Sequence, residues 1–261
     1  MRNIHFESPL SNPYVVIPTY NEALNLETVV RQITQAVSNA TVLVVDDNSP
    51  DGTGDIAREL AAQGLPIKIL SRPKKMGLGS AYRDGFAYSI SNGASACVEI
   101  DADLSHDPKS IPTLLSALDA GHALAIGSRY VRGGSSPGLP PIRKLISRGG
   151  NWYASKALGI TVKDATAGFR AYTVAILRRI DMDKIRADGY GFQIEMTFAV
   201  EQLSGGIAEV PIAFGSRTAG ESKMDARIVI EAMKFCTAAG ISLRLRQMES
   251  RSRSIDYEKI L

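Results

Sequence analysis

The sequence predicts an α/β fold in which a mainly parallel sheet is flanked by helices within a single domain. Short apolar runs alternate with helical patterns from Tyr14 onward, as is typical of parallel strands joined by helices. Acidic residues directly follow two of these runs, and open α/β sheets bind ligands beyond the carboxyl ends of their strands. The 261 residues, 44% hydrophobic and 22% charged, suffice for one large globular domain with a substantial core.

Five apolar runs, each four or five residues long, are expected to form the first part of the sheet. They cover residues 14–18, 41–45, 67–71, 97–100 and 123–127. Beyond them the pattern loosens, and we expect short elements at 171–180 and another strand at 208–214.

Helices are expected between these strands. The apolar residues of 26–37 recur at the three- and four-residue spacing of one helix face, and Pro108 suits a first helical turn. The remaining helices are expected at 53–62, 80–91, 108–120, 142–158, 192–203 and 226–245. Residues 133–141, GGSSPGLPP, form a loop by composition. We therefore expect one domain over residues 1–245 and a flexible basic tail over 246–261.

The most informative segment is an apolar run that ends in two aspartates one residue apart, Asp101 and Asp103. Carboxylate oxygens suit Mg²⁺ or Mn²⁺ better than Zn²⁺, and such an ion can neutralise the diphosphate of a departing nucleotide. The alternative is an acidic turn after a strand. The second acidic strand end, Asp46 and Asp47, favours a binding site, because carboxylates accept hydrogen bonds from ribose hydroxyls or a base.

The first strand also ends in polar residues, including Tyr20 and Glu22. These side chains can face a ligand, although Asn21 and Glu22 also suit the start of a helix. Residues 74–79, KKMGLG, place cations and flexible backbone before a helix, where anions are favoured. A glycine hinge is the alternative, and the loop lacks the ending of a P-loop.

Residues 129–148 carry five basic side chains and no acidic one, interleaved with apolar residues. A solvated basic face is the usual explanation. Beside a carboxylate–metal site, however, the mixture suggests a phosphate attached to an apolar group, and residues 217–223 form a second basic cluster. His106 follows the two aspartates and is expected to lie at a helix entry rather than to bind metal.

The composition limits the classes of partner and the cellular compartment that we expect for this protein. Thirty basic and 27 acidic residues give a net charge of +3, too small to indicate nucleic acid. The two cysteines lie in apolar patterns and fit a reducing cytoplasm. No secretory leader is expected, and residues 228–243 are too short and too charged to span a membrane. A lipid substrate would have to be reached peripherally or through a partner.

These segments together resemble the GT-A family 2 glycosyltransferases, in particular the dolichol-phosphate or polyprenol-monophosphate mannose synthases. The matching strings run in order from about Val15 to Lys223: VIPTYNEALNL, VLVVDDNSPDGTGDIA, RPKKMGLGSAYRDGF, EIDADLSHDP, GSRYVRGG, DATAGFRAY, GYGFQIEM and VPIAFGSRTAGESK. The resemblance implies transfer of mannose from GDP-mannose to a polyprenyl monophosphate with inversion, aided by Mg²⁺ or Mn²⁺.

The resemblance also implies roles for individual residues. The nucleotide-sugar side comprises Pro18, Tyr20, Glu22, Asp46, Asp47, Lys75, Gly77, Asp101, Ala102 and Asp103, of which Asp101 and Asp103 also hold the metal. The acceptor phosphate side comprises Arg129, Arg143, Arg148, Arg170, Arg217 and Lys223. Asp101, Asp103 and Arg129 are the expected catalytic residues, and Asp164 and Glu195 are assigned to the acceptor side. Some family members carry glutamine in place of Ser105.

The family resemblance suggests an enzyme on the cytoplasmic face of a membrane, with a separate anchoring protein in place of the carboxy-terminal spans of some relatives. A phosphate monoester, with a second pKa of about 6, is already largely dianionic at neutral pH. We therefore expect direct in-line attack without a general base or a covalent enzyme intermediate.

Two alternatives remain: transfer of glucose or another sugar from a UDP-sugar, and a non-catalytic nucleotide-sugar-binding subunit. A dehydrogenase is disfavoured because no GxGxxG follows the first strand.

Overall fold

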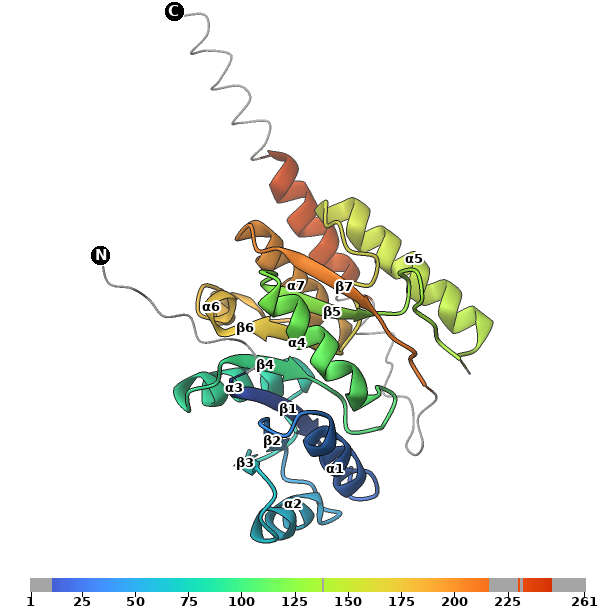
Figure 1. Ribbon diagram of the computed structural model, residues 1–261. Helices are drawn as coiled ribbons and strands as arrows, with labels where there is room; N and C mark the ends of the chain where they lie inside the picture. The colour runs from blue at the N-terminus through green and yellow to red at the C-terminus, as the bar shows by residue number, and fades with distance from the viewer. Residues whose placement is uncertain (1–10, 138, 216–229, 231, 246–261) are drawn as a thin grey trace, which may run out of the picture.

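The computed structural model describes residues 11–137, 139–215, 230 and 232–245. It contains one seven-stranded sheet with the strand order β3-β2-β1-β4-β6-β5-β7, and helices pack on both of its faces (Figure 1). The predicted α/β class and single domain are confirmed.

The strands match the apolar runs closely. They are β1 (Pro13–Thr19), β2 (Thr41–Asp46), β3 (Ile67–Ser71), β4 (Ala96–Glu99), β5 (Leu124–Ser128), β6 (Arg170–Thr173) and β7 (Ile207–Pro211). The helices are α1 (Leu26–Ala36), α2 (Thr53–Ala62), α3 (Leu78–Ser91), α4 (Ile111–Asp119), α5 (Pro141–Leu158), α6 (Val174–Leu177) and α7 (Tyr190–Gln202), with 3₁₀ turns at Pro108–Ser110 and Met182–Lys184. A further helix covers residues 232–245, and the expected tail lies outside the described residues.

The sheet is parallel except at β6, which runs antiparallel to both β4 and β5. The short elements expected at 171–180 are this strand and α6. The predicted strand at 208–214 is shorter than expected, because residues 212–215 leave the sheet after β7 and run beside the loop that follows β5. Asn21 does not cap a helix, since α1 begins after Asn25 and Asn21 has a φ of 60° in a turn.

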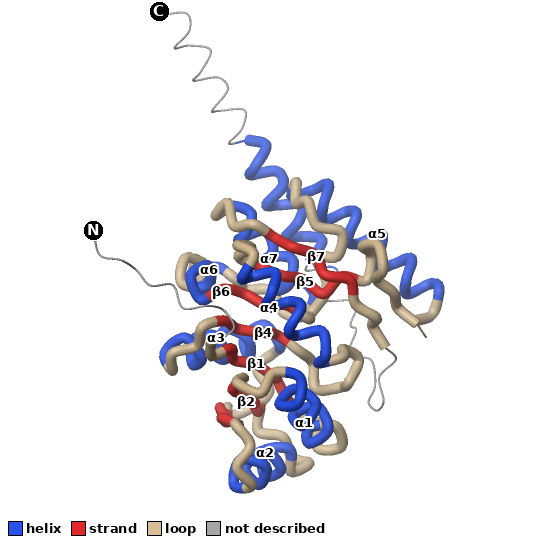
Figure 2. The backbone as a smooth tube through the Cα atoms, in the orientation of Figure 1, coloured by secondary structure: helices blue, strands red, loops and turns tan. Residues whose placement is uncertain are grey.

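Two apolar cores lie on opposite faces of the sheet, as expected for strands buried on both sides. One core joins the sheet to α1, α2 and α4, and the other joins it to α3, α6 and α7 and to parts of α5 and the 232–245 helix. Figure 2 shows the strands as a layer between these two sets of helices. Both cysteines are buried and free, and burial raises the pKa of the Cys97 thiol to about 12.

Candidate active site

The strand directions bring the predicted polar residues to one edge of the sheet. Strands β1, β2 and β4 are mutually parallel, and β5 points the same way because both β4 and β5 oppose β6. Their carboxyl ends are followed by Asp46 and Asp47, by Asp101 and Asp103, and by Arg129. Acidic and basic side chains that lie far apart in the sequence therefore share this edge.

Asp46 is buried at the end of β2 and is held by its neighbours. Its Oδ1 accepts hydrogen bonds from Thr19 Oγ1 at 3.0 Å and from Ser49 Oγ at 2.5 Å, and its Oδ2 accepts one from Ser49 N at 3.2 Å. Asp46 thus joins the ends of β1 and β2 to the turn before α2. Its contact with a nucleoside stays a prediction.

Asp47 forms a buried ion pair with Arg72, a residue that the sequence analysis did not single out. Arg72 Nε lies 2.6 Å from Asp47 Oδ1 and Nη2 lies 3.1 Å from Oδ2. The Nη1 atom of Arg72 also donates to Asp84 and Ser80 of α3, each at 2.9 Å, and Met76 N donates to Asp47 Oδ2 at 3.0 Å. The pair therefore fixes residues 72–76 beside the end of β2.

The other predicted residues of the nucleotide side line the rim of this region. Pro18, Tyr20 and Glu22 are half-buried, and Glu22 N donates to Thr53 Oγ1 at 3.0 Å. The ammonium group of the exposed Lys75 lies 4.6 Å from the centre of the Tyr20 ring, close enough for a cation–π interaction. This contact brings the loop after β3 to the end of β1.

The amino-terminal end of α3 is occupied by a carboxylate from a distant loop. Asp188 Oδ1 accepts a hydrogen bond from Gly79 N at 3.1 Å. Gly77 has a φ of +95°, and a Cβ at this position would collide with the Asp188 carboxylate. This helix end is therefore not open to an anion as predicted, because Asp188 satisfies it. A contact of Gly77 with the nucleotide sugar stays a prediction.

The two aspartates after β4 differ in exposure. The Asp101 side chain is 35% exposed, whereas Asp103 is buried and its Oδ1 accepts a hydrogen bond from Ser105 N at 3.0 Å. Ala102 between them is buried. The Oγ of Ser105 is buried and has no hydrogen-bond partner.

This donor set fits a small hard cation. Two carboxylates and an unsatisfied hydroxyl supply only oxygen atoms, which Mg²⁺ and Mn²⁺ prefer, and Mg²⁺ usually keeps positions for water or phosphate. Among the described residues, no group of three His, Cys, Asp or Glu side chains is arranged to hold a metal ion. Any ion here would thus depend on ligands beyond the protein carboxylates.

His106 lies at the predicted helix entry, directly before Asp107, but does not itself cap the helix. It is buried, its ring centre lies 5.1 Å from those of both Phe169 and Phe214, and its Nε2 lies 4.0 Å from Asp101 Oδ2. Asp107 instead caps the following 3₁₀ turn by accepting a hydrogen bond from Lys109 N. His106 therefore packs beside Asp101 within the site.

Arg129 follows β5 and makes a two-point ion pair with Asp164. Nη2 lies 2.6 Å from Oδ1 and Nε lies 2.8 Å from Oδ2, and Arg129 N also donates to Oδ2 at 2.9 Å. Burial lowers the pKa of Arg129, but the hydrogen bonds and charge of Asp164 outweigh that effect and raise it. Arg129 is thus a fixed cation, partly balanced by a buried carboxylate.

The basic residues of α5 extend from this pair towards the surface. Tyr130 contacts two guanidinium groups, with Cζ of Arg129 at 5.1 Å and Cζ of Arg148 at 5.4 Å from its ring centre, and its hydroxyl donates to Ser147 Oγ at 2.8 Å. Arg143 is exposed on the same helix. Arg217 and Lys223, also predicted to bind phosphate, lie outside the described residues.

Arg170 does not belong to a phosphate site, and that prediction is wrong. Its side chain is fully buried, and its guanidinium donates to the carbonyl oxygens of Ala165, Ala167 and Gln193 and to Thr197 Oγ1. Arg170 therefore fastens β6 to α7 and to the segment before β6. A lone arginine in an apolar run resembles a ligand in sequence, but here it is a structural residue.

Glu195 also supports local structure. Its Oε2 accepts hydrogen bonds from the backbone nitrogens of Arg186 at 2.8 Å and Ala187 at 3.2 Å. Burial raises the pKa of Glu195, although these hydrogen bonds oppose the shift. The residue holds the loop that carries Asp188, and a contact with the acceptor stays a prediction.

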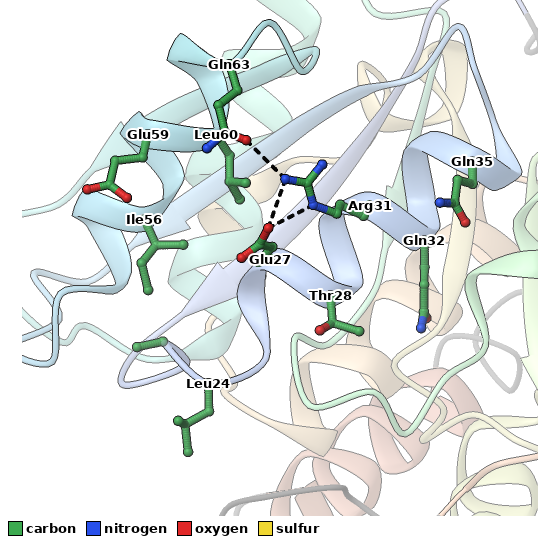
Figure 3. A pocket seen from close by; sticks show the side chains of 11 residues that line it. Leu24, Glu27, Thr28, Arg31, Gln32, Gln35, Ile56, Glu59, Leu60 and Gln63 are labelled. Atoms are coloured by element: carbon green, nitrogen blue, oxygen red, sulfur yellow. Dashed lines mark hydrogen bonds and ion pairs between the residues drawn. The ribbon is translucent and has the colours of Figure 1, made fainter.

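A separate hollow lies between α1 and α2 (Figure 3). Within it, Arg31 donates to Glu27 at 2.8 Å and to Gln63 at 3.0 Å. Its lining includes none of the predicted site residues. We therefore place the candidate active site at the sheet edge and assign no role to this hollow.

Comparison with known proteins identifies the family of the chain. Residues 14–181 match the family described as glycosyl transferase family 2. The chain is 45% identical over 236 residues to a protein of Micrococcus luteus named undecaprenyl-phosphate mannosyltransferase, covering 90% of this chain and 97% of that protein. It is 43% identical to polyprenol monophosphomannose synthase of Mycolicibacterium smegmatis, covering 91% and 90% of the two chains.

Two further comparisons extend the similarity. Dolichol-phosphate mannosyltransferase of Pyrococcus furiosus is 38% identical over 224 residues, which are 84% of this chain and 61% of that protein. Glucosyl-3-phosphoglycerate synthase of Mycobacterium tuberculosis, solved in complex with Mn²⁺, UDP-glucose and phosphoglyceric acid, superposes with a TM-score of 0.65 at 22% identity, covering 87% of this chain and 80% of that one. The structural similarity confirms the predicted GT-A fold.

Proposed function

Since the chain belongs to glycosyl transferase family 2 and is a glycosyltransferase, we propose that it transfers mannose from GDP-mannose to a polyprenyl monophosphate with inversion. The names of its three curated relatives support mannose as the sugar and a polyprenyl or dolichyl phosphate as the acceptor. The observation that carries the proposal is the shared sheet edge, where Asp101 and Asp103 follow β4 and the cationic Arg129 follows β5. Two negatively charged substrates need both the divalent cation that the carboxylates would hold and the positive charge of Arg129.

The nucleotide side is assigned to the ends of β1 and β2. Pro18, Tyr20, Glu22 and Asp46 would border the nucleoside, and Lys75 would bring a cation near it. Asp47 would act by holding residues 72–76 through Arg72. Guanine is proposed over uracil because the relatives are mannose synthases, and a UDP-sugar is the alternative that the donor assay below excludes or supports.

The metal side is assigned to Asp101 and Asp103. A divalent cation, Mg²⁺ or Mn²⁺, would supply positive charge to the diphosphate as it leaves with the nucleoside. Asp101 is the more exposed carboxylate, so it can reach a ligand directly. Asp103 is positioned by its hydrogen bond with Ser105 N.

The acceptor side is assigned to Arg129 and to the basic residues beyond it. The ion pair with Asp164 holds Arg129 at the end of β5, and Arg143, Arg148, Arg217 and Lys223 would add positive charge around the phosphate. Because a phosphate monoester is already largely dianionic at neutral pH, no side chain has to act as a base. The protein would instead orient the phosphate oxygen for in-line attack on the anomeric carbon.

The outward face of α5 supports action at a membrane surface. Its side opposite the core carries exposed Ile142, Leu145 and Trp152 at 63%, 67% and 65% exposure, with Arg143 and Arg148 flanking them. An apolar helix face bordered by cations is typical of helices that lie in a membrane interface. Within the described residues, no helix has the length and hydrophobicity needed to cross a bilayer.

The 232–245 helix lies beside α5 (Figure 1) and exposes Met233, Ile241 and Leu245. The Tyr153 hydroxyl and Thr237 Oγ1, 2.6 Å apart, join the two helices. These two helices therefore support peripheral contact with a membrane surface, whereas the cytoplasmic face and a separate anchoring protein are proposed from the family resemblance alone.

The donor assay tests the reaction. The purified protein is incubated with a short polyprenyl phosphate and, separately, with radiolabelled GDP-mannose, GDP-glucose, UDP-glucose and UDP-mannose. We expect a β-linked mannosyl lipid from GDP-mannose, loss of product with EDTA, and its return with Mg²⁺ or Mn²⁺. Asp103→Asn should be inactive at any metal concentration. Product from a UDP-sugar alone, an α-linked product, or no turnover with any donor would contradict the proposal.

Vesicle binding tests the membrane assignment independently of turnover. The wild-type chain should sediment with anionic vesicles, and less so at high salt. Leu145→Asp and Trp152→Asp should reduce the bound fraction. Leu24→Asp is the matched control, because Leu24 is an exposed apolar residue on the α1 side of the molecule. Equal binding by all four proteins would argue against α5 as the contact surface.

A further inference from the structure

Phe214 lies between the metal side and the acceptor side of the candidate active site. Its ring centre is 5.1 Å from that of His106, and the guanidinium carbon of Arg129 lies 5.5 Å from the Phe214 ring centre. His106 in turn lies 4.0 Å from Asp101. The Phe214 side chain therefore contacts both His106, which lies beside Asp101, and Arg129, which is assigned to the acceptor side.

The backbone around Phe214 is tied to the same two loops. Phe214 N donates to Ser135 O at 2.9 Å, in the loop that follows Arg129. Gly215 N donates to Ser105 O at 2.9 Å, in the loop of Asp101 and Asp103. Consecutive residues therefore tie the backbone at Phe214 to both loops, which fixes the position from which its ring extends.

We propose that Phe214 is a positioning residue that sets the His106–Asp101 contact and the Arg129 guanidinium relative to each other. On the metal side, the ring packs edge-on against His106, and such packing limits rotation of the imidazole beside Asp101. On the acceptor side, its face receives the Arg129 cation and helps to fix the guanidinium plane. The proposal rests on the proposed function for the identity of the two substrates.

The test compares two binding events that need no turnover. Binding of Mn²⁺ alone is followed by electron paramagnetic resonance, and binding of a short-chain prenyl phosphate by calorimetry. For Phe214→Ala we expect both dissociation constants to rise together, each about three- to tenfold, the loss expected when one aromatic or cation–π contact is removed. Phe214→Tyr keeps the ring and should restore both constants.

The control is Phe198→Ala, which removes a ring of α7 whose centre lies 6.1 Å from that of Phe235 in the 232–245 helix. It should leave both constants unchanged. If Phe214→Ala does not fold, Phe214→Leu keeps the apolar bulk without the ring and takes its place. A change in one constant only, in neither, or in a manner that Phe214→Tyr does not reverse overturns the proposal. Failure of mannosyl transfer in the wild-type protein would contradict the proposed function alone, because neither binding measurement depends on it.

Discussion

Asp164 holds Arg129 through two parallel contacts, Nη2 to Oδ1 at 2.6 Å and Nε to Oδ2 at 2.8 Å, and its side chain is fully buried. Glu209 in turn accepts hydrogen bonds from the backbone nitrogens of Lys163 and Asp164 at 2.8 and 3.0 Å. The guanidinium at the end of β5 is therefore fixed by a carboxylate that is itself fixed by β7. Arg129 is a preorganised group rather than a mobile surface cation.

Asp164→Asn should destabilise the fold strongly. The substitution keeps the shape of the side chain but leaves the guanidinium of Arg129, whose side chain is only 9% exposed, without its counter-charge. Breaking a buried pair in this way costs about 3–5 kcal/mol, measured as the free energy of unfolding in urea. Glu27→Gln, which breaks the exposed pair with Arg31, should cost less than about 1 kcal/mol. Equal losses of unfolding free energy in the two variants would show that the buried Arg129–Asp164 pair stabilises the fold no more than an exposed ion pair does.

Arg72→Lys should weaken nucleotide binding although it keeps the positive charge. Arg72 contacts Asp47, Asp84 and Ser80 with three different nitrogens, and a single ammonium group cannot reproduce this planar arrangement. We expect the KM for the nucleotide sugar to rise about tenfold or more, the effect of losing one charge-assisted hydrogen bond.

The control for Arg72→Lys is Arg58→Lys, because Arg58 pairs with Asp55 on the exposed surface of α2. This variant should keep the wild-type KM for the nucleotide sugar. If Arg72→Lys also kept it, the Asp47–Arg72 pair would serve stability rather than the nucleotide side.

Asp188→Ala should loosen the start of α3. Without the carboxylate, Gly79 N loses its acceptor at 3.1 Å, and removal of a side-chain cap costs about 1 kcal/mol. Faster hydrogen exchange is expected at the Gly79 amide, measured by NMR. Asp183→Ala removes an exposed carboxylate from the preceding 3₁₀ turn and should leave the Gly79 amide protected. Unchanged exchange at Gly79 in Asp188→Ala would contradict the cap.

The sequence was informative where local pattern decides the structure. Apolar runs placed the strands within a few residues, and the position of Asp101 directly after a run placed it at the carboxyl end of β4. Such inferences need only strand period and strand direction. The antiparallel direction of β6 has no local signal, because it follows from pairing with both β4 and β5.

The errors concern contacts between residues far apart in the chain. Asp188 reaches the start of α3 from 109 positions away, so the glycine-rich segment before that helix looked like an open anion site. Arg170 was misassigned because most of its hydrogen-bond acceptors are buried backbone carbonyl oxygens. Every residue carries such an oxygen, so the sequence gives no sign of this pairing. The ring contacts of His106 could not be predicted, because neither Phe169 nor Phe214 is adjacent to it in sequence.

Glu99 provides the last prediction, on the pH dependence of stability. It is fully buried on β4, where it accepts a hydrogen bond from Gln193 Nε2 at 2.8 Å. Burial raises the pKa of Glu99 to about 7, although the nearby charge of Arg170 and the Gln193 hydrogen bond oppose the shift. The unfolded chain releases this proton near pH 4.5, its ordinary value, whereas the folded chain keeps it until about pH 7. Stability should therefore fall as pH rises through this window and stay constant above it.

Glu99→Gln isolates this contribution, because glutamine resembles the protonated acid in shape and does not titrate. Urea unfolding of both proteins at pH 5 and pH 8 gives the difference in unfolding free energy at each pH. From pH 5 to pH 8 that difference should shift in favour of Glu99→Gln by about 2–3 kcal/mol, most of the free energy that corresponds to the raised pKa. Glu59→Gln, an exposed position on α2, should show the same difference from wild type at both pH values. The absence of a shift between pH 5 and pH 8 would mean that Glu99 is held as a carboxylate in the fold, paired with Arg170 rather than protonated.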